Sequence, residues 1–175
     1  PWWVTDASKA PDAKTAAGAA ALAADKPSGR WAVEVHDPRP GTLLLSRGGA
    51  APAGQPYYED AAVLLVKVCH CRPSIFGLVL PRRAGATNLT VGLTMPPPVR
   101  IALHSFVNHS LRVGGPAGPH VTTIHDAKSV AGALELQPGV YAGGCPMDAQ
   151  RRIDRGELSA DAFTFFTGYA AWPIE

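Results

Sequence analysis

Short apolar runs bounded by turn residues recur along the chain from about residue 41 onward. Gly41–Ser46, Ala61–Val68 and Ile75–Leu80 are each only a few residues long and rich in Leu and Val. Apolar runs of this length predict buried strands. The links between them are too short for a helical crossover, so we expect the three strands to pair antiparallel.

The second half of the chain continues as short segments separated by turns. Further strands are predicted at Leu111–Val113, Val121–His125, Leu134–Leu136, Gly139–Tyr141 and from Phe163 to Trp172. Pro146–Arg155 has the character of a helix, with Gly156 at its C-terminal cap and Ser159 or Asp161 capping the next turn. Val99–Leu103 fits either a strand or a short helical turn.

Residues 1–30 differ from the rest of the chain. Ala13 to Asp25 is almost all Ala, which favours either a marginal helix or a tether, because alanine adds little apolar bulk for docking. Trp2 and Trp3 are the exception, and two adjacent indoles are expected to anchor on the domain or on a partner protein. We therefore expect an Ala/Pro-rich N-terminal extension over 1–30 and one domain over 31–175.

The composition limits the classes of function. With 175 residues, 46% of them hydrophobic and 17% charged, the chain has the make-up of one globular domain. A net charge of +2 without a basic face argues against nucleic-acid binding. No apolar run approaches the roughly 18 residues that a membrane-spanning helix needs. The sequence gives no oligomeric state.

The triplet Cys69-His70-Cys71 draws attention as a thiol metal or redox site. On a strand its two sulfurs would face one side and the imidazole the other. A structural zinc site needs four ligands, and no pattern brings Cys145 near as a further thiol. We expect packed thiols and no metal, and keep the thiol site as an alternative hypothesis.

No nucleophile motif of the G-x-S-x-G type is present, and the glycine turns match neither a phosphate loop nor a dinucleotide fingerprint. We therefore expect no enzyme activity and no cofactor. An alternative is an enzyme or small-ligand binder with a cleft near Gly114–Pro116 and His125.

The aromatic residues gather near the C-terminus. A stripe of this kind is typical of a hydrophobic core, with a partner-binding patch as the alternative. Its members are Phe163, Phe165, Phe166, Tyr169 and Trp172.

Taken together, the ordered segments resemble the AlgH/YqgE-like family of poorly characterised proteins. The segments that carry the resemblance are Gly41–Ser46 with Tyr57–Val66, Ser74–Arg82, Leu111–Ala117 with Val121–His125, and Gly156 through Trp172. The last contains Phe-Thr-Phe-Phe-Thr-Gly-Tyr-Ala-Ala-Trp, which is similar to the closing signature of the family. The chain departs from the family pattern at Asp60, Pro81 and Ala171, and the family's C-terminal helix is expected to be truncated here.

The resemblance implies an α+β fold, a single domain with a curved or barrel-like, mainly antiparallel sheet flanked by a few helices. It brings no established catalytic residue. Plants and green algae have plastid versions, and the Ala- and Gly-rich style, with Trp31 ahead of the first strand and no initiator Met, predicts a chloroplast protein after removal of its transit peptide. We accordingly expect a non-catalytic accessory or interaction protein, a subunit of a larger chloroplast assembly with other protein chains as partners.

Overall fold

The strands and helices follow the order expected from the apolar runs. The computed structural model describes residues 37–46, 58, 61–69, 74–81 and 90–173. The strands are β1 (Leu43–Leu45), β2 (Ala61–Cys69), β3 (Ser74–Pro81), β4 (Leu111–Val113), β5 (Ala117–His125), β6 (Ala133–Gln137), β7 (Val140–Gly143) and β8 (Phe163–Pro173). The helices are α2 (Pro97–Ala102) and α3 (Pro146–Asp154), with short 3-10 turns η3 (Val91–Thr94), η4 (His104–Phe106) and η5 (Ala160–Ala162).

All eight strands belong to one sheet. Seven of them follow the order β1-β2-β3-β8-β5-β7-β6, and β4 pairs with β8 off this path. The first three strands pair antiparallel, as expected, with Leu44 opposite Val63 and Val63 opposite Val79. The β4–β8 pair is parallel and every other strand pair is antiparallel, so the sheet is mainly antiparallel.

The two edges of the sheet approach each other, which curls it into a half-barrel. Gln137 of β6 donates its side-chain amide to the carbonyl of Gly41, just before β1, at 2.6 Å. A Cβ atom on Gly41 would overlap the carbonyl oxygen of Leu136, so only glycine permits this approach. The fold is therefore the single-domain α+β architecture expected from the family resemblance.

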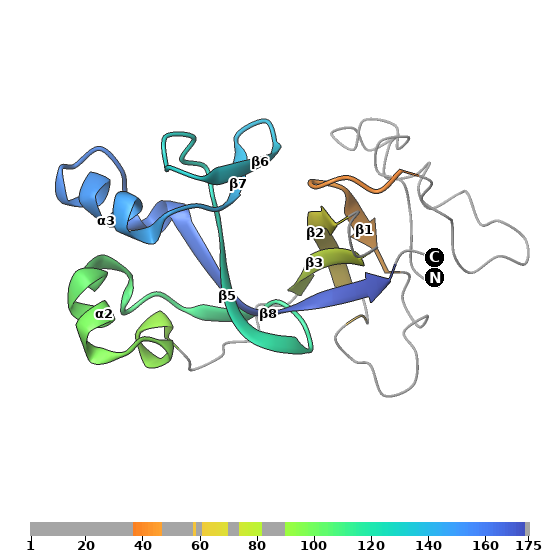
Figure 1. Ribbon diagram of the computed structural model, residues 1–175, viewed down its shortest axis with the longest axis horizontal. Coiled ribbons are helices and arrows are strands. Elements are labelled where there is room, and N and C mark those ends of the chain that lie inside the picture. The colour runs from red at the N-terminus through yellow and green to blue at the C-terminus, as the bar shows by residue number, and fades with distance from the viewer. Residues whose placement is uncertain (1–36, 47–57, 59–60, 70–73, 82–89, 174–175) are drawn as a thin grey trace, which may run out of the picture.

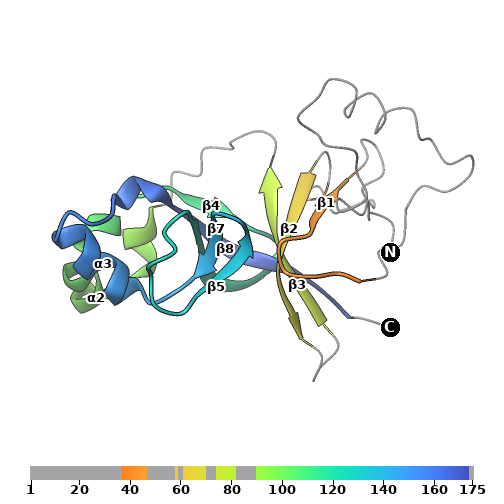
Figure 2. The same ribbon diagram turned by 90° about the horizontal axis from the view of Figure 1, so that it is seen from above.

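The elements separate along the longest axis of the molecule. In Figures 1 and 2, α2 and α3 lie at one end and β1, β2 and β3 at the other, with β5 and β8 running between. Val99–Leu103, predicted to form either a strand or a short helical turn, is mostly helical, because α2 begins at Pro97 and continues to Ala102. Proline is tolerated in the first helical turn, where an amide hydrogen would have no partner.

The expected caps of the last helix are confirmed. Gly156 follows α3 with φ +73°, the left-handed conformation that ends many helices. Ser159 caps η5 by accepting a hydrogen bond from the amide of Asp161. Within the described ranges no helix has the length and apolarity needed to cross a membrane.

Candidate functional site

An apolar cleft of about 390 Å³ opens at the helical end of the molecule. Its walls come from η3 and α2 on one side and from β5, the end of β7 and the start of α3 on the other. The lining residues are Val91, Thr94, Met95, Pro96, Val99, Leu103, Phe106, Val121, Thr122, Thr123, Val130, Gly143, Gly144, Cys145, Pro146, Ala149, Phe163 and Phe165. None of them carries a formal charge.

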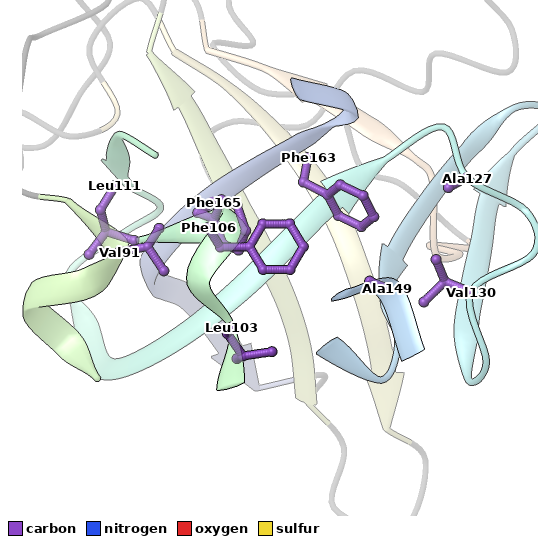
Figure 3. Packing of buried hydrophobic residues seen from close by; sticks show 9 residues of the cluster. All are labelled: Val91, Leu103, Phe106, Leu111, Ala127, Val130, Ala149, Phe163 and Phe165. Carbon is purple, nitrogen blue, oxygen red and sulfur yellow. The ribbon is translucent and has the colours of Figure 1, made fainter. Parts of the chain in front are cut away.

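Three phenylalanine rings form the inner wall of the cleft. Phe106 of η4 meets Phe163 and Phe165 of β8, each with ring centroids 5.3 Å apart and interplanar angles of 65° and 62°. Figure 3 shows these rings gathered at the centre of the cluster, with Ala149 of α3 and Val130 nearby. Edge-to-face packing is the arrangement that aromatic quadrupoles prefer. The three phenylalanines of the aromatic stripe are thus buried, as expected, and Phe163 and Phe165 also face the cleft, whereas Tyr169 and Trp172 are half-buried.

A glycine turn shapes the wall where β7 ends. Gly143 and Gly144 have φ of +70° and +91°, which lets the chain turn sharply into α3. The carbonyl of Gly143 accepts hydrogen bonds from Thr123 Oγ1 and His125 Nε2, both at 3.0 Å. This wall is therefore fixed by side chains of β5.

A polar cluster holds the two helical walls together. Gln150 of α3 is 2% exposed, and its Oε1 accepts from the Ser105 amide at 3.1 Å. Its Nε2 donates to Ser105 Oγ at 2.7 Å and to Asp154 Oδ1 at 2.8 Å. His104 Nε2 lies 3.4 Å from the same carboxylate. Since η4 and α3 both border the cleft, this cluster sets their spacing.

Asp148 ties the first turn of α3 to the loop between β5 and β6. The hydrogen bond from the Ala131 amide, followed by that from Arg152, lowers the pKa of Asp148 to about 2. A second arginine, Arg151, lies 3.4 Å from its other oxygen. The carboxylate is therefore charged at neutral pH and its charge is balanced by neighbouring groups.

The polar groups of the cleft are few. Its polar side chains are hydroxyls and one thiol, and Thr94 and Thr123 already donate to the carbonyls of Val91 and Gly143. Cys145, at the N-terminal cap of α3, is exposed and unpaired. Among the residues that the structure describes, no group of three or more His, Cys, Asp or Glu could hold a metal ion.

His125 and the Gly114–Pro116 turn do not come together. His125 is 3% exposed, its ring lies 4.8 Å from that of Phe163, and its Nδ1 has no hydrogen-bond partner. His125 pairs with Phe163 at the start of β8, whereas Ala117, next to the turn, pairs with Tyr169.

The glycine turn itself is packed tightly. A Cβ on Gly114 would lie 2.7 Å from the carbonyl oxygen of Gly168, and one on Gly115 would overlap the backbone of Tyr169. The turn is a close strand-to-strand contact. Neither it nor His125 is among the cleft residues.

The other residues singled out in the sequence fall elsewhere. Cys69 is the last residue of β2, whereas Cys145 lies at the N-terminal cap of α3. Cys71, Trp2 and Trp3 lie outside the described residues, as does the whole extension 1–30.

Sequence reasoning missed the cleft and the Gln150 cluster. One signal was available for Cys145, because Gly143-Gly144 before a predicted helix places the next residue at its N-terminal cap. For Gln150 no local signal exists, since its partner Ser105 is 45 residues away.

The comparisons with known proteins agree with the fold. Two curated relatives, UPF0301 proteins from Pelodictyon phaeoclathratiforme and Chlorobaculum tepidum, are each 33% identical over 70 residues. These matches cover 38% of this chain and only 36% of the length of each relative.

One solved structure supports the fold, and a second is similar at a lower score. A crystal structure of a protein from Corynebacterium diphtheriae superposes with a TM-score of 0.54 at 18% identity, over 81% of this chain and 70% of that one. The solution structure of the AlgH protein from Pseudomonas aeruginosa gives 0.47 at 19% identity, over 81% and 72%. The model of the AlgH-like family matches residues 50–175. The chain therefore belongs to the AlgH-like family.

Proposed function

We propose that this protein is a non-catalytic binding protein that holds an apolar ligand in the cleft between α2 and α3. The observation that carries the proposal is a cleft of about 390 Å³ whose lining residues are all uncharged and chiefly apolar. Small-molecule sites in proteins have volumes of roughly 300–1,000 Å³ and linings of this kind.

The lining supports binding rather than catalysis. Proton transfer at a reacting group needs a positioned acid or base. The cleft residues include no His, Asp, Glu or Lys, and Cys145 is the one thiol among them. A thiol without a neighbouring base in the cleft is not activated by the usual pairing.

A second role, as an accessory subunit of a larger assembly, draws on a separate observation. Ile101 of α2 is 78% exposed and Leu93 of η3 is 60% exposed, and neither lines the cleft. In this proposal these two exposed apolar side chains contact another protein. In this proposal the assembly is in the chloroplast, because the Ala- and Gly-rich sequence predicts a chloroplast protein.

The binding proposal can be tested with N-phenyl-1-naphthylamine, an uncharged apolar dye whose fluorescence rises on leaving water. Ala149 is 2% exposed and lines the cleft, so Ala149→Leu adds carbon atoms into the cavity. We expect the wild-type protein to bind the dye and this variant to bind it at least tenfold more weakly.

The matched control is Ala102→Leu, the same substitution on α2 at a position outside the lining. It should leave dye affinity unchanged. Absence of dye binding to the wild type, or equal weakening by both variants, would refute the binding proposal. Circular dichroism melting of both variants establishes that each is folded.

A further inference from the structure

An exposed arginine stands at the rim of the cleft. Arg100 of α2 follows Val99, a lining residue, and its Nε donates to the carbonyl of Met95 at 2.9 Å. Met95 also lines the cleft, so this hydrogen bond holds the guanidinium beside a residue of the lining. Guanidinium groups present several donors and bind carboxylates well.

No carboxylate within the described residues forms an ion pair with Arg100. On α3, across the cleft, Asp148 forms ion pairs with Arg151 and Arg152. Arg152 also contacts Glu157 at 3.0 Å. On the α3 side of the cleft the positive and negative charges therefore pair with each other. On the α2 side Arg100 has no acidic partner within the described part of the chain.

The start of α3 is a poor alternative site for an anion. Helix N-termini attract negative charge, but Asp148 already occupies the first turn of α3 and accepts the Ala131 amide. A second negative group there would meet the charge of Asp148. Of the two, Arg100 is therefore the better site for an anion.

Resting on the binding function proposed above, we infer that the ligand is a linear aliphatic carboxylate of about ten to twelve carbons, with its chain in the cleft and its carboxylate at Arg100. The uncharged lining accepts the chain, and the rim cation matches the charge of the head group. A volume of about 390 Å³ holds roughly thirteen heavy atoms, if each takes about 30 Å³, the volume of one water molecule in the liquid.

The probes are decanoate, decanol and decyltrimethylammonium, which share one chain and differ in head-group charge. Each is titrated against the wild-type protein carrying N-phenyl-1-naphthylamine, and displacement of the dye gives its affinity. We expect decanoate to bind more tightly than decanol, and decyltrimethylammonium to bind most weakly. Affinity should rise by about fourfold for each methylene between octanoate and dodecanoate, and then level off once the cavity is full.

Reversing the rim charge tests the role of Arg100 directly. In Arg100→Glu, decanoate should lose affinity by about fivefold, the upper range for an exposed ion pair, and decyltrimethylammonium should gain it. Decanol should change little. Arg112→Glu, on an exposed arginine of β4 outside the cleft lining, is the matched control and should leave all three affinities unchanged.

The outcomes separate this inference from the binding function beneath it. Equal binding of all three head groups, or no change of preference in Arg100→Glu, overturns the carboxylate inference and leaves the cleft as an apolar site. Failure of every probe to displace the dye overturns the carboxylate inference as well. Failure of the dye itself to bind refutes the cleft function.

Discussion

Two hydrophobic clusters at opposite ends of the molecule are built in different ways. The cleft cluster consists of Val91, Leu103, Phe106, Leu111, Ala127, Val130, Ala149, Phe163 and Phe165. The strand cluster consists of Leu44, Tyr58, Ala61, Val63, Leu65, Val79 and Ala170. Most residues of the cleft cluster line the cleft, whereas no residue of the strand cluster does.

The difference follows from the elements that supply the side chains. In the strand cluster nearly every member comes from paired strands, whose fixed register spaces side chains evenly, as Leu44 opposite Val63 shows. The cleft cluster draws on short helices, 3-10 turns and loops, which meet at irregular angles around three large rings. Regular pairing fills space, whereas irregular packing leaves a cavity that a ligand can use.

β8 joins the two clusters, and Gly168 is the point at which its partners change. Before Gly168 the strand pairs with β4 and β5; beyond it, Tyr169 still pairs with Ala117 of β5, and β3 is the partner from Ala170 onward. Gly168 has φ +72°, and a Cβ there would overlap the carbonyl oxygen of Gly115. A close approach of two backbones therefore connects the strand half to the cleft half.

The largest expected effect comes from breaking this junction. Gly168→Ala should lower the free energy of unfolding by more than about 4 kcal/mol, because a left-handed residue and a backbone clash act together. Urea denaturation measures it. Gly139→Ala is the control: Gly139 has φ +80° with nothing within 4 Å of its Cβ position, so about 1–2 kcal/mol is expected. Equal losses in the two variants would contradict the role given to Gly168.

The next effect sharpens the contrast between the clusters. Phe106 is 1% exposed and Leu65 is fully buried. Phe106→Ala should cost about 3–5 kcal/mol and Leu65→Ala about 2–5 kcal/mol of unfolding free energy. In N-phenyl-1-naphthylamine titrations at a temperature where both variants are folded, only Phe106→Ala should change affinity. A comparable change in Leu65→Ala would show that the two clusters are not independent.

The smallest effect is a pH dependence confined to the cleft half. The pKa of Asp148 is about 2, well below its ordinary value of 3.8, chiefly because the Ala131 amide donates to its carboxylate. A lowered pKa means that the charged carboxylate stabilises the fold above about pH 4 and that this contribution fades as the pH falls towards 2. The difference in unfolding free energy between wild type and Asp148→Asn should therefore shrink over that interval.

Urea titrations at pH 6, 4, 3 and 2 measure this difference. Asp126→Asn, on an exposed side chain, controls for the loss of one negative charge anywhere on the surface. A stability gap for Asp148→Asn that stays constant down to pH 2 would contradict the assignment.

Much of the fold could be predicted from local patterns. The strands over Ala61–Val68 and Ile75–Leu80 follow from apolar runs between turn residues, and both exist with antiparallel pairing. The helix predicted over Pro146–Arg155 exists as Pro146–Asp154, with Arg155 as its C-terminal cap. The curved sheet was expected only from the family resemblance, because curvature depends on contacts such as that between Gln137 and Gly41.

The candidate site was the harder part. His125 and the Gly114–Pro116 turn were reasonable sites by residue type, but side-chain chemistry alone does not tell whether a polar group faces a cavity or the core. His125 lies in the core because β5 places its ring against Phe163. The apolar lining residues of the cleft were individually indistinguishable from ordinary core residues.

The sequence by itself determined where strands, helix ends and tight turns occur, because each depends on residues within a few positions of one another. It also determined the family, through the spacing of aromatic and glycine residues in the last strand. Only the tertiary structure decided the cleft, the Gln150 cluster and the position of Arg100 at the rim. These depend on side chains brought together from distant parts of the chain, as the 45 residues between Ser105 and Gln150 show, and no local pattern encodes such distances.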